Sequence, residues 1–163
     1  MGNHPPEPDP TYLRLRDHIF QLEPVVLGLS LSSTTRKVWG VLMETGYEVG
    51  IASLVSLADG TTSLYYSTGG GILGSPDYTP LAEASKALVM EAQKVDSEMR
   101  LVKDVPLPSI GQVRFTCLTF TGRLTAEVSE KSLASGSQPL SKIYALGRET
   151  LSQLRVLSDK CHH

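Results

Sequence analysis

The dipeptide Asp59-Gly60, between two apolar stretches, restricts the fold more than any other feature of this chain. Aspartate followed by glycine supplies the two positive-φ positions of a type I′ turn, so residues 51–57 and 61–68 are predicted to pair as an antiparallel hairpin. Residues 51–57 are apolar on both faces apart from two serines, which is typical of a central strand covered on both sides. The hairpin therefore predicts a sheet with helices on each face.

Further regions of the sequence show strand patterns. Residues 38–43 form an apolar run before the hairpin, and residues 113–117 and 124–128 alternate in polarity on either side of a turn at Thr121-Gly122. Residues 25–31 alternate as well, but the flanking proline and serines equally suit an irregular connection, so an edge strand there stays an open alternative. These patterns predict about five strands.

Three helices are predicted from their start signals. Asp9-Pro10 and Thr79-Pro80 each place a capping residue before a proline that fits the first helical position, and Pro139 opens the last helix. Pro24 ends the first helix. The elements follow the order α-β-β-β-α-β-β-α, so the predicted fold class is α+β, with a single mainly antiparallel sheet of about five strands packed against helices.

This order of elements resembles that of small profilin-like and roadblock-like scaffolds. The resemblance concerns the fold alone, and it implies antiparallel strands backed by helices that pair through a sheet edge or a helix face. With 163 residues, 40% of them hydrophobic, the chain is predicted to form one α+β domain over residues 10–157. The proline-rich arm 1–9 and the tail 158–163 are predicted to be disordered.

Charge and cysteine content restrict the partners and the compartment. Fifteen Lys and Arg residues against seventeen Asp and Glu residues give a net charge of −2, which provides no field to recruit nucleic acid or an anionic membrane. No apolar run approaches the roughly 20 residues of a membrane span. Cys117 lies in a predicted strand, where a packed, unreactive thiol is expected, and Cys161 lies near the chain end. Because this pair is a poor basis for a disulfide, a reducing cytoplasm is predicted.

The residues that catalysis most often needs are sparse. Glu44 and Glu48 bracket a turn, and such a pair is more typical of solvated surface than of a catalytic site. Gly2 with His4, and residues 161–163, offer metal ligands, but a disordered tail has no surrounding structure to hold them in place. No metal, cofactor or catalytic residue is therefore predicted.

The predicted function is a non-catalytic binding or scaffolding domain that acts through protein–protein contacts. We expect a homodimer or a subunit of a larger assembly. Tyr65 and Tyr66 are among the aromatic residues that lie on elements able to expose them, whereas Trp39 and Tyr144 are expected in the core.

A glycine run directly after the third predicted strand carries an alternative function. Residues 69–74 satisfy the pattern G-x-G-x-x-G, but a dinucleotide site needs a helix that begins within the motif, and here Pro76 intervenes. The run is a flexible connection to the second helix, a place where another backbone approaches closely, or a set of backbone amides that bind a small anion with help from the helix dipole. This alternative is a small-molecule or anion-binding protein, or a weak enzyme. Its candidate ligand-binding residues are Ser67, Thr68, Gly69, Gly70, Gly71 and Thr79.

Overall fold

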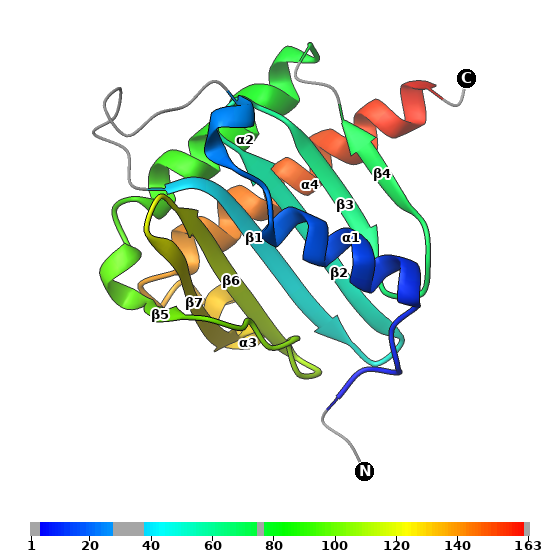
Figure 1. Cartoon of the computed structure of the whole chain (residues 1–163). Coiled ribbons are helices and arrows are strands. Elements are labelled where there is room, and N and C mark those ends of the chain that lie inside the picture. Colours follow the sequence, from blue (N-terminus) through cyan, green and yellow to red (C-terminus); the bar gives the residue numbers. More distant parts are fainter. Residues whose placement is uncertain (1–3, 28–37, 75–76, 162–163) are drawn as a thin grey trace.

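The computed structural model describes residues 4–27, 38–74 and 77–161, which form a single antiparallel sheet with helices on both faces (Figure 1). Within these ranges the sheet has seven strands in the order β4-β3-β2-β1-β6-β7-β5. The strands are β1 (Val38–Tyr47), β2 (Gly50–Leu57), β3 (Thr62–Tyr66), β4 (Gly71–Gly74), β5 (Arg100–Val102), β6 (Gln112–Thr119) and β7 (Gly122–Ser129). The helices are α1 (Pro10–Phe20), α2 (Thr79–Ala92), α3 (Glu130–Ala134) and α4 (Ser141–Cys161), with short 3₁₀ segments η1 (Pro24–Leu27) and η3 (Asp96–Glu98).

The predicted fold class is confirmed, but the predicted strand number of about five is wrong. The two additional strands, β4 and β5, lie at opposite edges of the sheet. β4 has four residues, two of them glycine, and β5 has three residues. Segments this short have too few positions for a polarity pattern to stand out. Their order in the sheet is set by pairing with β3 and β7.

The hairpin around Asp59-Gly60 is confirmed, although its turn type differs from the prediction. β2 and β3 pair antiparallel, with Leu54 opposite Leu64. Gly60 has φ +95°, but no residue other than glycine has a positive φ within the described part of the chain, so Asp59 does not supply the first position of a type I′ turn. Instead its side-chain Oδ1 accepts a hydrogen bond from the Thr61 amide at 2.9 Å.

The two faces of the sheet are covered differently. In Figure 1, α2 and α4 lie behind the sheet and α1 crosses its front. β1 lies in the middle of the sheet, and all its residues except Tyr47 are buried, as expected for a strand shielded on both faces. Its alternate residues contact opposite layers: Met43 lies against Gly147 of α4, whereas Glu44 bonds to Arg16 of α1.

The starts of the first two helices follow the predicted signals only in part. Asp9 caps α1, because its Oδ1 accepts a hydrogen bond from the Thr11 amide at 2.7 Å, and Pro10 occupies the first turn. In α2 the capping position is Tyr78 rather than Thr79, and its side chain makes no capping bond. α1 ends at Phe20, before Pro24.

Other boundaries also differ from those expected. Of the alternating residues 25–31, residues 25–27 belong to η1, and the remainder lies outside the described residues. α4 runs to Cys161, so the predicted boundary at residue 158 falls inside this helix. In the described ranges, no helix is both long and apolar enough to cross a membrane.

Candidate functional site

β4 forms one edge of the sheet, and its hydrogen-bond pattern leaves a set of backbone groups facing outward. Tyr66 N–H donates to the Gly70 carbonyl at 3.1 Å. Because bonded and non-bonded pairs alternate along an antiparallel ladder, Ile72 bonds to Leu64 of β3, and the N–H and C=O groups of Gly71 and Leu73 point away from β3. The open edge of β4 therefore presents the backbone groups of Gly71 and Leu73.

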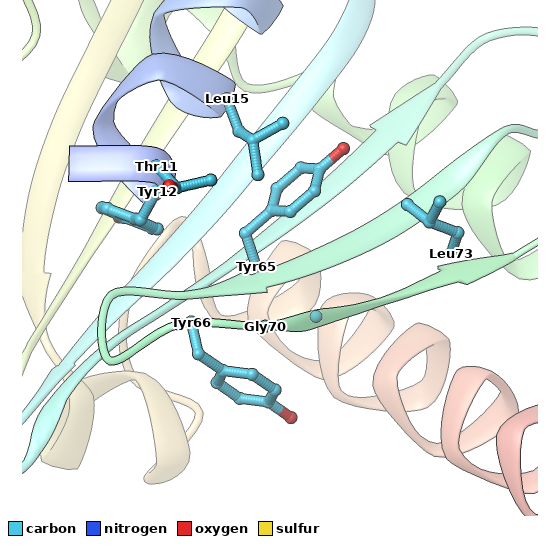
Figure 2. Close-up of a pocket in the computed structure, with 9 residues that line it drawn as sticks. Thr11, Tyr12, Leu15, Tyr65, Tyr66, Gly70 and Leu73 are labelled. Atoms are coloured by element: carbon cyan, nitrogen blue, oxygen red, sulfur yellow. The ribbon is translucent and has the colours of Figure 1, made fainter. Parts of the chain in front are cut away.

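A pocket of about 350 Å³ adjoins this edge, between α1 and the β3–β4 hairpin (Figure 2). Leu15 of α1 and Tyr65 of β3 face one another across it, and Leu73, which is 75% exposed, lies at its side. The lining residues are Thr11, Tyr12, Leu15, Tyr65, Tyr66, Gly69, Gly70, Gly71 and Leu73. Such a volume falls in the range of ligand pockets, and its walls are mainly aromatic and aliphatic.

The structure brings together only some of the residues predicted to bind a ligand. Gly69, Gly70 and Gly71 line the pocket, whereas Ser67, Thr68 and Thr79 do not. Thr79 is exposed at the start of α2, beyond the far end of β4. The proposed helix dipole at Thr79 therefore acts at the opposite end of β4 from the glycine turn.

Ser67 has a structural role. Its side chain is buried, and its Oγ accepts a hydrogen bond from the Ile51 amide at 2.7 Å. Its carbonyl accepts a hydrogen bond from the Asp9 amide, also at 2.7 Å. Ser67 thus ties the β3–β4 turn to β2 and to the residue that caps α1. Thr68 is exposed on the turn.

The glycine run is a hairpin turn followed by a strand, and not a flexible connection to the second helix. Gly69 and Gly70 have φ values of +112° and +80°, which residues with a Cβ rarely adopt. A Cβ added to Gly71 would lie 2.3 Å from the Leu64 carbonyl oxygen. Glycine at these positions is therefore explained by turn geometry and by the close approach of β3 and β4.

The electrostatics of the turn do not favour an anion. The Gly69 amide already donates to the Tyr66 carbonyl at 3.0 Å. The Asp9 carboxylate lies near the same turn, with Oδ2 4.0 Å from where a Cβ of Gly69 would be. The described residues that line the pocket include no Lys or Arg. A neutral, apolar group fits these surroundings better than a phosphate or a carboxylate.

One wall of the pocket is held in place by a buried polar network between α1 and the sheet. The Glu44 side chain is fully buried, with its carboxylate 2.7 and 2.9 Å from Nε and Nη2 of Arg16. Ser53 Oγ donates to Glu44 at 2.7 Å, and the Tyr12 hydroxyl lies 2.7 Å from the same Ser53 oxygen. The interpretation of Glu44 as solvated surface is wrong. Glu48, its partner in that interpretation, is exposed.

The network raises the pKa values of Tyr12 and Arg16. Burial and the nearby Glu44 charge raise the pKa of the Tyr12 hydroxyl above its usual range. Burial alone would lower the pKa of the Arg16 guanidinium, but the hydrogen bonds and charge of Glu44 outweigh it, so this pKa is raised. Arg16 Nη2 also donates to the Val105 carbonyl at 3.2 Å. The paired guanidinium thus fixes α1 to β1 and to the segment before β6.

The network does not form a site for acid–base catalysis. Glu44 has no exposed surface, and of the network only Tyr12 lines the pocket. Sequence reasoning missed Glu44 because a charged residue beside a turn is usually solvated. A signal was present: Tyr12 and Arg16 are four residues apart on one helix face, where an acidic residue of the sheet below can form hydrogen bonds to both. Trp39 and Tyr144 are buried, as predicted.

Comparisons of the chain with protein-family models, with curated proteins and with solved structures found no match. The resemblance to profilin-like and roadblock-like scaffolds therefore stays a prediction. The geometry of the β4 edge and its pocket is the basis for the functional proposal below.

Proposed function

We propose that this protein is a non-catalytic binding domain that acts through protein–protein contacts at the open edge of β4. The observation that carries the proposal is the position of this edge beside a pocket that an apolar side chain can enter. An extended segment that adds to β4 gains main-chain hydrogen bonds from Gly71 and Leu73, and alternate side chains of the segment meet the pocket. Affinity and specificity then come from adjacent parts of the same surface.

The exposed residues of this surface support the proposal. Leu73 is 75% exposed and Leu15 is 37% exposed, and both line the pocket. β4 itself, with the sequence Gly-Ile-Leu-Gly, carries no charged residue. Sheet edges of this kind pair readily with other strands unless charge, proline or a covering segment prevents it. A reducing cytoplasm is part of the proposal, and the free, buried thiol of Cys117 supports it.

Small-molecule binding is a second candidate function, favoured by the volume of the pocket. Its mainly apolar walls and the hydroxyls of Thr11 and Tyr65 suit a neutral ligand with an aromatic or aliphatic body. Native mass spectrometry of the protein isolated from its own cell would reveal such a ligand as an added mass. Loss of that mass in the Leu15→Trp variant, in which the larger ring fills the pocket, would favour this function over protein docking.

Site-specific photo-crosslinking in the producing cell tests the leading proposal. A photoreactive amino acid at the exposed position 68 lies on the turn that leads into β4. We expect a covalent adduct with a polypeptide, lost when Leu73→Asp places a charge on the docking surface. The matched control is Leu101→Asp, because Leu101 is an exposed leucine on the opposite edge strand. An adduct of equal yield in both variants, or no polypeptide adduct, would contradict the proposal.

A further inference from the structure

The geometry of β4 points to a second copy of this chain as the partner, paired antiparallel to β4 about a two-fold axis at Ile72. This inference rests on the proposed function and specifies its partner. Gly71 and Leu73 are the outward-facing residues, and they are separated by one residue whose backbone bonds to β3. The edge is therefore symmetric about Ile72.

That symmetry gives one register in which every outward-facing group of the strand is satisfied. With Ile72 opposite the partner's Ile72, Gly71 faces the partner's Leu73, and Leu73 faces the partner's Gly71. Each facing pair exchanges N–H···O=C bonds in both directions, as bonded pairs of an antiparallel ladder do. The two seven-stranded sheets would join into one continuous sheet.

The side chains in this register are complementary in size. Tyr65 pairs with both Ser53 and Gly71, so Gly71 lies on the face of the sheet that α1 covers, and Leu73 lies on the same face. A two-fold axis normal to the sheet keeps these faces on the same side of the dimer. The exposed Leu73 side chain then lies over the partner's Gly71, which has no side chain and lines the partner's pocket.

A second copy explains these features better than an arbitrary peptide. The strand carries a large apolar residue and a glycine at the two positions that meet each other in the symmetric register. Because residues 71–74 are uncharged, two copies of the strand meet without like-charge repulsion. Each copy would both fill and offer a pocket, which gives an isologous interface. The site is complete only when the partner's Leu73 is present.

Sedimentation equilibrium of the full-length chain tests the inference. We expect a reversible dimer at micromolar concentration, and we expect Leu73→Asp to raise the dimer dissociation constant at least about tenfold, because the carboxylate would be buried in the apolar pocket. Leu101→Asp, on the opposite edge, should leave the constant unchanged. Leu73 is mostly exposed, so circular dichroism should show both variants folded. A parent chain that stays monomeric at high micromolar concentration would overturn the inference.

Cysteine substitution tests the register. In the Cys161→Ser background, Ile72→Cys places two thiols on a non-hydrogen-bonded pair, with Cα atoms about 4.5 Å apart, which a disulfide can bridge. Leu73→Cys places its thiols two residues out of step, about 8 Å apart, which is too far. We expect an oxidised dimer only with Ile72→Cys. Efficient linkage through residue 73 and not 72 would show another register and contradict the proposed axis.

The two proposals fail in different ways. If the chain is monomeric and the position-68 adduct contains a different polypeptide, the binding function stands and the dimer inference is wrong. If position 68 gives no polypeptide adduct and the chain is monomeric, both are wrong. A dimer that survives Leu73→Asp but not Leu101→Asp would place self-association at β5 and would contradict the dimer inference, while the position-68 adduct would still decide the binding function.

Discussion

At one edge of the sheet β4 exposes an uncharged strand beside a pocket, whereas at the other edge β5 contains a charged residue and is followed directly by two more. β5 has three residues and begins at the exposed Arg100, and the exposed Lys103 and Asp104 follow it directly. Charged residues on and beside an edge strand are a usual means by which natural sheets prevent pairing with other chains. β4 has none of these charges within its bounds.

The exposed leucines of the two edges show the same contrast. Leu101 of β5 is 63% exposed, but its Cδ1 lies only 2.9 Å from where a Cβ of Gly122 would be, so it rests on a glycine of its own chain. Leu73 of β4 is 75% exposed, and in the proposed dimer it rests on the partner's Gly71. The comparison teaches that an edge leucine can be covered in two ways. Leu101 packs on a glycine of its own chain, whereas Leu73 is left exposed for a glycine of a partner chain.

The largest expected effect concerns the β4 side, where Glu44 holds the α1 wall of the pocket. Glu44→Ala leaves the Arg16 guanidinium buried without its partner, so we expect the free energy of unfolding to fall by about 3–5 kcal/mol. Urea denaturation measures this loss. Glu48→Ala is the control, because Glu48 is exposed, and it should change stability by less than about 0.5 kcal/mol. Equal effects of the two substitutions would show that the network does not anchor α1.

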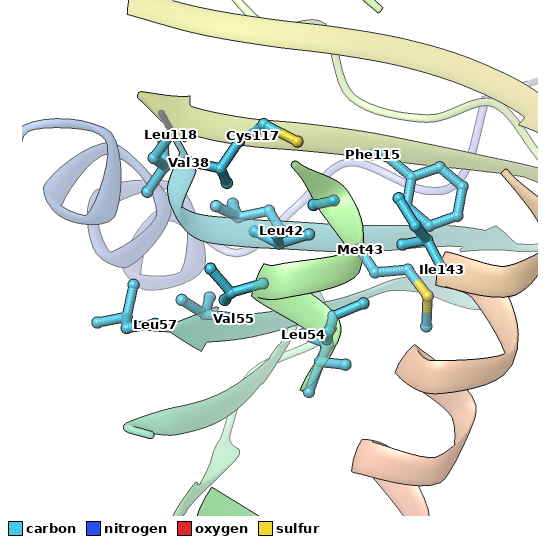
Figure 3. Packing of buried hydrophobic residues seen from close by; sticks show 14 of the residues in the cluster. Val38, Leu42, Met43, Leu54, Val55, Leu57, Phe115, Cys117, Leu118 and Ile143 are labelled. Atoms are coloured by element: carbon cyan, nitrogen blue, oxygen red, sulfur yellow. The ribbon is translucent and has the colours of Figure 1, made fainter. Parts of the chain in front are cut away.

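A second prediction concerns the β5 side, where Cys117 of β6 is one of the buried core residues (Figure 3) and its Sγ lies 3.5 Å from the Sδ of Met99, one residue before β5. Burial, with a smaller contribution from Asp96, raises the pKa of the Cys117 thiol from its ordinary 9.0 to about 12. The folded protein therefore holds the thiol protonated at a pH where the unfolded chain releases the proton. This stabilisation is fully present below pH 9 and is lost as the pH rises to about 12.

The size of this effect follows from the shift. The free energy of unfolding should fall by about 4 kcal/mol as the pH approaches 12. Denaturation curves of the parent chain and of Cys117→Ala, recorded from pH 8 upward, measure it. The parent should lose stability more steeply than the variant above pH 9. Parallel pH profiles would contradict a buried, protonated thiol at this end of the sheet.

A smaller loss of stability is expected on substitution of Arg123, which links the segment after β5 to the end of α1. Its Nη1 donates to the Lys103 carbonyl at 2.9 Å and its Nη2 donates to the Phe20 carbonyl at 3.0 Å, with the guanidinium over the Phe20 ring. Arg123→Ala should reduce stability by about 2 kcal/mol, and Arg123→Lys should recover only part of it, because an ammonium cannot span both carbonyls. Thermal denaturation should rank the parent chain as most stable, Arg123→Lys as intermediate and Arg123→Ala as least stable. Full recovery by lysine would mean that charge alone matters there.

The sequence predicted the parts of the fold that rest on local signals. The β2–β3 hairpin has Asp59-Gly60 and two long apolar strands, and α1 has the Asp9-Pro10 cap, so both were predictable from neighbouring residues. β4 was not, because a four-residue strand with two glycines looks like a loop until it pairs with β3. Thr79 does not line the pocket, because it follows β4 at the end away from the glycine turn, and its role in ligand binding stays a prediction.

The candidate site was predictable in part for the same reason. Gly69, Gly70 and Gly71 were selected from their composition, and they do line the pocket, but as a turn and a strand edge. The other wall comes from α1, some fifty residues earlier in the chain, and it is positioned by the bond between Arg16 and Glu44. A contact between elements so far apart in sequence leaves no local pattern.

Residue-resolved amide hydrogen exchange, measured by NMR at low and at high protein concentration, tests most directly whether β4 is the docking edge. The amides of Gly71 and Leu73 face outward from the sheet in the single chain. We predict that their exchange slows as the concentration rises, while exchange of the β5 amides stays constant. Exchange at Gly71 and Leu73 that is independent of concentration, or protection that develops at β5 instead, would contradict the assignment of β4 as the edge that a second copy completes.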